Sequence, residues 1–430
     1  MPDRRLLGVV FVIALVCRVI PWLAAAPDPA RLLSPPDSAE YVAIGHNVVA
    51  GHGFSADPAP PYRPDLRRTP AYPSLLAGAF LMPNGGLRLA SFLGVLAGAA
   101  AVAATFWMAA RLFGRSAALV AGLFLALDLT SISYSVVIMT EALFTLLLVA
   151  GVSVLMKRPL GSAVSIRGGL LLGCATLCRP AGLLLAPVSL PLCAWQQSGG
   201  GRIARDYLRV NAVFLLVLLL WIGRNFIVAG TPTLSSIWSV NLYFHRAAAV
   251  EARLEGRTVD EVRDRWERGF QSLSGSLSEA DKLEWMTAHA REVIVAHPWT
   301  YVLITVDGFV YMMKSDISEL RRLFGLHEGS AALRAVDVSA SMQLWILYPA
   351  AAIGLLAAWR DPDRRLAALI LVAFIAYFVL VSGPEAYARF RVPVMPFLVM
   401  LGGLGIEQGV VWIRERVDSG NRLALERGDM

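Results

Sequence analysis

Long apolar runs recur along the whole chain and restrict what it can fold into more than any other feature. A helix needs about 20 consecutive apolar residues to cross a bilayer. The 430 residues are 56% hydrophobic and 17% charged, whereas soluble domains carry about 25% charged residues. The predicted crossings are 6–26, 86–110, 116–128, 134–156, a bent pair 168–178 and 181–195, 208–228, 341–358, 364–382 and 391–413. The chain is therefore predicted to be a single all-helical, polytopic membrane bundle of about ten crossings.

Basic residues gather at the ends of these runs rather than in the continuous patch that is typical of nucleic-acid-binding proteins. The clusters are Arg4 and Arg5, Arg111 and Arg115, Lys157 with Arg158 and Arg167, Arg202 with Arg205 and Arg209, Arg360 with Arg364 and Arg365, and Arg414 with Arg416. Placing all six on the cytoplasmic side satisfies the positive-inside rule with one topology. We therefore expect a multi-pass protein of the inner or plasma membrane, with 414–430 as a cytoplasmic tail and no nucleic-acid partner.

The first polar region on the opposite side of the membrane is residues 27–84, a proline-rich outer loop. Within it, Ser38 to Ala50 is predicted to be a short helix that ends at Gly51 and Gly53. A helix over 72–82 would be too short to span the bilayer and is expected to re-enter it or to lie at its surface.

Residues 230–340 form a second outer region. Its segment 251–268 carries many charges of both signs with apolar residues at helical spacing, which predicts a solvated amphipathic helix. The apolar segment 298–313 is predicted to be interfacial, because counting it as a crossing would place the later basic clusters outside. The first run, 6–26, resembles a secretory signal, but Arg18 within it favours a retained crossing.

Asp37 is the first candidate for chemistry, because it opens the predicted helix directly after two prolines. One interpretation is structural: a carboxylate at this position caps the helix or stabilises its dipole. Glu40 and Tyr41 follow at three and four residues, so all three side chains share one helical face. His245 lies in the second outer region without a partner at a spacing typical of metal ligands.

Several short motifs follow one another in a characteristic order. They are Asp37 with Tyr41, Gly51-His52-Gly53-Phe54, Arg68-Thr69-Pro70-Ala71-Tyr72-Pro73, Thr140-Glu141, Arg179-Pro180, Trp221 with Arg224-Asn225, and Arg389-Phe390-Arg391. Each motif alone is weak, but together, over about residues 5–412, they resemble the membrane-embedded GT-C glycosyltransferases. The bacterial relatives of protein O-mannosyltransferases and the lipid A aminoarabinose transferases are the most similar members.

This resemblance implies transfer of a monosaccharide from a polyprenyl-phosphate donor to an acceptor hydroxyl at the outer face. Asp37 would be the catalytic acid-base residue, which accepts the proton of the attacking hydroxyl. A free aspartate has a pKa near 3.9, so we expect partial burial to make Asp37 a stronger base. A single displacement without a covalent enzyme intermediate predicts inversion at the anomeric carbon.

The departing lipid phosphate gains negative charge, and guanidinium groups are suited to stabilise it. The donor phosphate-binding candidates are Arg389, Arg391, Arg68, Arg179 and Arg224, with Arg389 and Arg391 favoured by the resemblance. The candidates for lining the substrate cavity are Glu40, Tyr41, Glu141, Tyr72 and His245. An unpaired carboxylate in an apolar run is costly, so Glu141 is expected either to form a structural ion pair with Arg18 or Arg179 or to serve the site.

A divalent cation held by Asp37 and Glu141 is an alternative to this arginine clamp. Ser38 stands where the related mannosyltransferases carry a second acid, so we favour a reaction without metal or other cofactor. A transporter or flippase of lipid-linked sugars is the alternative function, for which the arginines would bind phosphate without chemistry. The sugar, the lipid length and the acceptor, whether protein, lipid or glycan, are left open.

Overall fold

The computed structural model describes residues 3–83, 85–156, 161–190, 200–275 and 277–428, and all regular elements within them are helices. Six helices in this part of the chain are long and apolar enough to cross a membrane. They are α1 (Arg4–Ala25), α4 (Gly86–Leu112), α11 (Gly200–Ala229), α18 (Ala331–Trp359), α19 (Pro362–Ser382) and α20 (Met395–Gly428). The chain is thus an all-helical, multi-pass membrane protein, as predicted.

Two bent pairs raise the number of candidate spans to eight, so the predicted count of about ten is not confirmed. The pairs are α5 (Arg115–Ala126) with α6 (Leu129–Val136), bent by 56°, and α15 (Glu279–Ala296) with α16 (Pro298–Met313) and α17 (Ser318–Phe324), bent by 99°. The shorter apolar helices are α3 (Ala71–Leu81), α7 (Glu141–Leu155) and α8 (Ser162–Cys178).

The predicted crossing 134–156 is divided between α6 and α7. Asp128 caps the start of α6 by accepting a hydrogen bond from the Ser131 amide, and Val137 is extended at its end. The amide of Ile138 then donates to the carbonyl of Leu32, 2.8 Å away, so a contact with the first outer loop replaces the next helical bond. Apolar composition alone does not reveal such a break.

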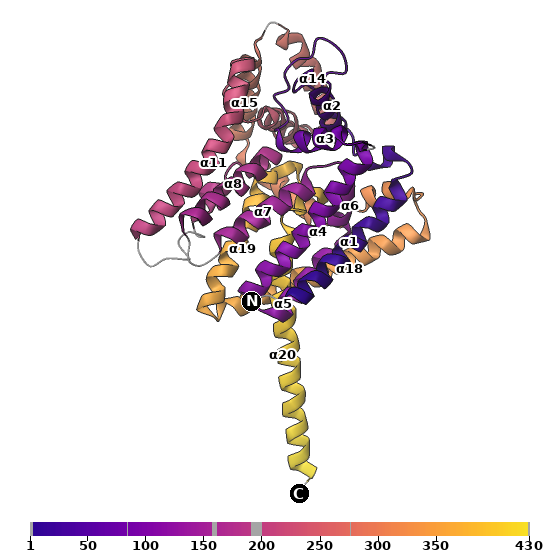
Figure 1. Cartoon of the computed structure of the whole chain (residues 1–430), viewed down its shortest axis with the longest axis vertical. Coiled ribbons are helices and arrows are strands. Elements are labelled where there is room, and N and C mark those ends of the chain that lie inside the picture. Colours follow the sequence, from indigo (N-terminus) through magenta and orange to yellow (C-terminus); the bar gives the residue numbers. More distant parts are fainter. Residues whose placement is uncertain (1–2, 84, 157–160, 191–199, 276, 429–430) are drawn as a thin grey trace.

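The outer regions form the end of the molecule that carries α2 (Asp37–Val49), α3 and α14 (Val259–Ser274), whereas α20 extends from the opposite end (Figure 1). The remaining elements of the first loop and the second region are η1 (Pro29–Leu32), α12 (Ile237–Asn241), the π-helix η3 (Leu242–Ala247) and α13 (Ala248–Glu255). The predicted helix over 251–268 is divided at Gly256, whose φ of 66° ends α13, and a capping box between Thr258 and Glu261 begins α14.

The break predicted at Arg179 and Pro180 is present, since α8 ends at Cys178 and the turn η2 (Pro180–Gly182) and α9 (Leu185–Val188) follow. Two further turns, η4 (Gly383–Glu385) and η5 (Ala388–Arg391), separate α19 from α20. Two predicted features lie outside the described residues. They are the basic pair Lys157 and Arg158, and residues 191–195 of the predicted crossing 181–195.

Glycines allow α20 to pack closely against α18 and α5. A Cβ atom on Gly405 would lie 1.9 Å from the carbonyl oxygen of Ala350, and one on Gly403 would lie 2.2 Å from that of Ala117. Gly354 of α18 meets the backbone of α20 at Leu401 in the same way, at 1.9 Å. Such small residues let helix backbones approach where lipid offers no hydrophobic driving force.

We predict that Gly405→Ala lowers the stability of the folded protein by about 1–3 kcal/mol, the usual cost of overpacking. The added methyl group would collide with backbone, which a change of side-chain rotamer cannot relieve. Gly409→Ala in the same helix is the matched control, because a Cβ there meets nothing within 4 Å. Thermal unfolding of the two purified variants in detergent measures the difference, and equal midpoints would contradict the close packing.

Candidate functional site

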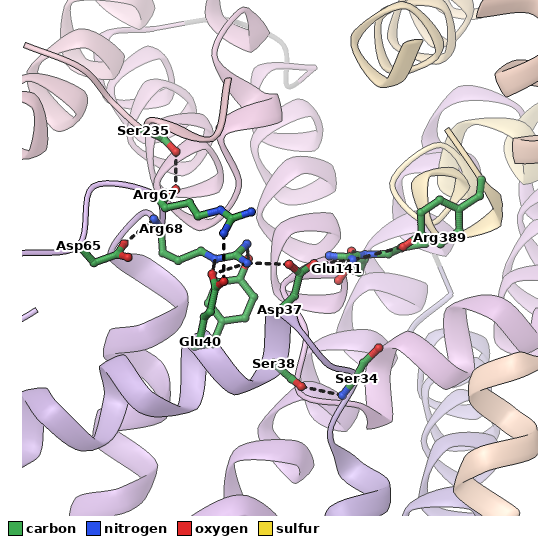
Figure 2. Close-up of polar contacts among 12 residues, drawn as sticks. Ser34, Asp37, Ser38, Glu40, Asp65, Arg67, Arg68, Glu141, Ser235 and Arg389 are labelled. Atoms are coloured by element: carbon green, nitrogen blue, oxygen red, sulfur yellow. Dashed lines mark hydrogen bonds and ion pairs between the residues drawn. The ribbon is translucent and has the colours of Figure 1, made fainter. Parts of the chain in front are cut away.

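Asp37 begins α2, and the first turn of this helix presents the three side chains that were predicted to share one face. Pro36 occupies the N-cap position and no side chain caps the helix there, so the alternative role of Asp37 as the cap is wrong. Instead, the carboxylates of Asp37 and Glu40 and the hydroxyl of Tyr41 all face the guanidinium group of Arg68 (Figure 2).

Arg68 binds this face through all three of its nitrogen atoms. Its Nη2 lies 2.6 Å from Asp37 Oδ1, its Nε lies 2.6 Å from Glu40 Oε2, and its Nη1 donates to the Tyr41 hydroxyl at 3.2 Å. The backbone amide of Arg68 donates to Asp65 Oδ1 at 2.7 Å, which fixes the loop that carries it. Arg67 contacts the other oxygen of Glu40 at 3.2 Å.

Arg389 reaches the same carboxylate from the opposite end of the sequence. It lies in the turn η5 between α19 and α20, and its Nη1 is 2.7 Å from Asp37 Oδ2. Its Nε donates to Glu141 at the start of α7, and Arg179 beyond α8 donates to the same oxygen. The guanidinium of Arg179 also stacks over the ring of Phe390, 5.1 Å from its centroid.

Seven charged side chains therefore alternate in sign along one continuous series, which we call the arginine–carboxylate network. In spatial order it consists of Arg67, Glu40, Arg68, Asp37, Arg389, Glu141 and Arg179. Figure 2 shows Asp37 between Arg68 on one side and Arg389 on the other. Four guanidinium and three carboxylate groups leave the network with one excess positive charge.

The network is buried at Glu141 and more open toward Arg67, whose side chain is 40% exposed. The side chain of Glu141 is 0% exposed and that of Arg389 is 12% exposed, whereas Asp37 and Glu40 are each 26% exposed. A ligand from outside therefore reaches Arg67, Glu40 and Asp37 before Glu141, and Arg68 and Arg389 lie on either side of Asp37. Glu141 is placed to hold Arg389 and Arg179 from behind.

The electrostatic state of Asp37 differs from what we expected. Burial by itself would raise the pKa of Asp37, but the guanidinium groups of Arg389 and Arg68 outweigh burial and hold this pKa well below its usual range. The expectation that burial makes Asp37 a stronger base is therefore wrong for the ligand-free protein. Any increase in basicity requires a partner that draws the arginines away.

The other predicted residues lie around the network or apart from it. Tyr72 is buried beside it, with its ring edge-on to that of Tyr41 at 5.2 Å. Arg224 donates to the backbone carbonyls of Asp65 at 2.8 Å and Phe54 at 3.3 Å, so it supports the loop that carries Arg68.

Arg391 points away from Asp37. Its guanidinium donates to the carbonyls of Met312 and Lys314 and to the hydroxyl of Thr130, and its side chain is buried. These contacts join η5 to the end of α16, which is a structural role and corrects the expectation that Arg391 faces donor phosphate. Only one residue of the favoured pair, Arg389, belongs to the network.

His245 lies in the π-helix η3, a rare form that often occurs at functional sites. Burial lowers its pKa, and Arg263 and Arg67 act in the same direction while Glu385 opposes them. Its imidazole is therefore neutral at pH 7.

Two contributors were not predicted. Asp65 positions Arg68, and the Tyr387 hydroxyl lies 3.4 Å from Arg389 Nη1. Both residues lie within three positions of a candidate arginine. Such a spacing is common in any sequence, so it did not single out these two residues.

Asp37 and Glu141 do not form a metal site by themselves in this arrangement, because Arg389 lies between their carboxylates. Within the described ranges, no group of three or more His, Cys, Asp or Glu side chains is placed to hold a metal ion. Glu141 pairs with Arg179, as one alternative predicted, and also with Arg389. Arg18, the other predicted partner of Glu141, donates instead to Ser135 and to the carbonyl of Ala126.

We predict that Arg389→Gln destabilises the fold, because it removes one of the two cations that neutralise the buried Glu141. A fully unpaired buried charge costs about 3–5 kcal/mol; Arg179 remains, so we expect about 1–3 kcal/mol. The double variant Arg389→Gln/Glu141→Gln should recover part of this loss, because its two effects are coupled. Thermal unfolding of wild type, both single variants and the double variant gives the coupling, and strictly additive effects would contradict the ion pair.

Solved structures with a similar fold are those of the oligosaccharyltransferase of Archaeoglobus fulgidus. The structure of that enzyme in complex with Zn and sulfate matches with a TM-score of 0.56 at 16% identity, over 98% of this chain and 51% of that chain. The structure of this archaeal enzyme, AglB, in complex with an inhibitory peptide and a dolichol-phosphate matches with a TM-score of 0.55 at 13% identity, again over 98% and 51%. The chain thus spans about half the length of these proteins.

ArnT from Cupriavidus metallidurans bound to undecaprenyl phosphate matches with a TM-score of 0.46 at 14% identity, over 93% of this chain and 60% of that chain, which is too weak to support a conclusion. No protein-family model matches the sequence. No curated protein matches it either. The archaeal structures establish the fold: over 98% of its length, this chain has the helical membrane fold of that oligosaccharyltransferase.

Proposed function

We propose that this protein is a glycosyltransferase that moves a monosaccharide from a polyprenyl-phosphate donor to an acceptor hydroxyl at the extracytoplasmic face, with inversion and without a metal ion. The observation that carries this proposal is the position of Asp37, a partly exposed carboxylate held between the guanidinium groups of Arg68 and Arg389. A base beside two fixed cations is what attack by a hydroxyl and departure of a phosphate require together.

The fold supports the same conclusion. An archaeal oligosaccharyltransferase of this fold is known in complex with a dolichol-phosphate, and in another structure it is tethered with an acceptor peptide. Both are properties of that enzyme, which is about twice as long as this chain. A bundle of this type can therefore hold a lipid phosphate in one structure and an acceptor peptide in another.

In the proposed reaction, the acceptor oxygen attacks the anomeric carbon while the bond from that carbon to the phosphate oxygen breaks. The electron pair leaves with the polyprenyl phosphate, whose charge increases from about −1 to −2, and the hydroxyl proton passes to Asp37. Arg68 and Arg389 stabilise the developing charge because their positions are already fixed by Glu40, Tyr41 and Glu141.

The donor phosphate also changes the base. In the ligand-free protein both carboxylate oxygens of Asp37 accept hydrogen bonds from arginines. A phosphate that shares these guanidinium groups neutralises part of their charge, which raises the pKa of Asp37 and frees a lone pair for the acceptor proton. Binding of the donor thus prepares the base for the step that follows.

We predict that Asp37→Asn lowers the rate of sugar transfer by about 10²–10⁴-fold, the usual contribution of a general base. Donor binding should be retained, because the asparagine leaves Arg68 and Arg389 without a competing carboxylate. Single-turnover assays with radiolabelled polyprenyl-phosphate sugar measure transfer and release of lipid phosphate. Asp57→Asn is the matched control in the same loop, because Asp57 pairs with the exposed Arg63.

Normal turnover by folded Asp37→Asn protein would remove Asp37 from this role. Movement of label across vesicles without release of lipid phosphate would instead identify a flippase. Product with retained anomeric configuration would exclude a single displacement.

We also predict that kcat/KM for the donor is independent of pH between about pH 5 and 8. This parameter reports the free protein, in which the arginines hold the pKa of Asp37 below its ordinary value, so the carboxylate stays ionised as the pH falls through this range. An acid limb can appear in kcat, which reports the donor complex. An acid limb near pH 6 in kcat/KM that Asp37→Asn abolishes would contradict this state of the free protein.

A further inference from the structure

A second cationic site lies outside the network, in a cavity of about 500 Å³ between η1 and α17. Three guanidinium groups and a single carboxylate line it, contributed by Arg31, Arg321, Arg322 and Glu319, with Gly325 in its wall. The lining side chains therefore carry two excess positive charges. The proposed reaction at Asp37 makes no use of any of these arginines.

The ion pairs of these arginines do not satisfy them. Arg31 pairs with Asp28 and Arg321 with Glu328, whose side chains are 54% and 82% exposed, and such solvated pairs contribute little to stability. Arg322 pairs with Glu319, but its Nε is buried and has no hydrogen-bond partner among the described residues. A buried donor of this kind is costly unless a ligand or water accepts from it.

The backbone is shaped to admit one of these guanidinium groups. Gly325 ends α17 with a φ of 62°, a conformation that favours glycine. A Cβ atom at this position would lie 2.7 Å from Nη1 of Arg31. Any other residue would therefore displace Arg31 from the cavity wall as well as strain the turn.

The surroundings of the cavity identify the kind of molecule that brings the anion. Helix α17 lies between α16 and α18 along the chain, and both of these helices expose large apolar side chains, including Val310 and Tyr311 of α16 and Val338 and Met342 of α18. In a membrane protein such surfaces face lipid. An anion that reaches this cavity beside acyl chains is a lipid headgroup, and the excess positive charge selects headgroups of net negative charge.

The cavity also adjoins the start of α2. Glu319 accepts a hydrogen bond of 2.6 Å from the Ser34 hydroxyl. The Ser34 amide donates to Ser38 Oγ at 2.7 Å, next to Asp37 (Figure 2). A ligand that binds Arg322 therefore acts on the side chain that holds this turn.

We propose that this cavity binds the phosphate of an anionic lipid headgroup from the leaflet that faces the network, through the guanidinium groups of Arg31, Arg321 and Arg322. The bound lipid fixes α17 against η1 beside the catalytic loop. This site is separate from the donor site and does not depend on glycosyl transfer.

The test is lipid binding by the full-length protein in detergent, measured by native mass spectrometry with dioleoyl-phosphatidylglycerol and dioleoyl-phosphatidylcholine. We expect the wild type to prefer phosphatidylglycerol, and Arg31→Gln/Arg322→Gln to weaken this binding by about 10-fold or more. The matched control, Arg253→Gln/Arg257→Gln, removes two exposed arginines of the second outer region and should leave binding unchanged. Arg31→Lys/Arg322→Lys keeps the charge and should retain part of the affinity if the glutamine variant does not fold.

Equal affinity for phosphatidylglycerol in the wild type and in folded Arg31→Gln/Arg322→Gln protein would overturn the proposal. So would an equal loss in the control, which would indicate general surface charge. Inorganic phosphate alone at the same concentration should not compete, and displacement of the lipid by it would overturn the assignment of the ligand as a lipid. None of these results requires sugar transfer, so failure here leaves the proposed glycosyltransferase function intact.

Discussion

A carboxylate that is removed from water must be paired, and in this protein that requirement organises the outer end of the bundle. Glu141 is completely buried at the start of α7, and two guanidinium groups neutralise it, one from the turn after α8 and one from the turn before α20. The desolvation cost of the acid makes both turns converge on it. Because Arg389 also reaches Asp37, the same ion pairs attach the first outer loop to the last helices of the chain.

In the proposed reaction, the network combines an acid-base residue with an anion site. Arg68 and Arg389 are held in place before any ligand arrives, so little reorganisation is needed when charge develops on a leaving phosphate. The same arginines suppress the basicity of Asp37 in the ligand-free protein, and the proposed donor phosphate would share them. A single arrangement thus orders the proposed events, with donor binding before proton transfer, and the rear acid Glu141 keeps Arg389 oriented while Asp37 changes its charge.

Particular residues show which features of the fold and of the site can be predicted from the sequence. The helix predicted over Ser38 to Ala50 is present as Asp37–Val49, and its first turn carries three side chains on one face, because helical spacing alone determines both. The break after Cys178 follows from Pro180 in the same direct way. Arg389 and Arg391 look equivalent in sequence, yet one binds two carboxylates and the other binds backbone carbonyls of α16, since two positions apart in a turn face different neighbours.

The sequence by itself determined that this chain spans a membrane several times, where its long polar loops lie along the chain, and which charged residues are too costly to leave unpaired. These properties depend on local composition and helical period. Only the tertiary structure decided which carboxylate each arginine of the network pairs with. Arg68, Arg179 and Arg389 come from three distant segments, and no local rule states which carboxylate each one meets. Their convergence sets the pKa of Asp37 below its usual range, opposite to what burial alone would do, since the sign of such a shift depends on distances between groups that only the packed bundle creates.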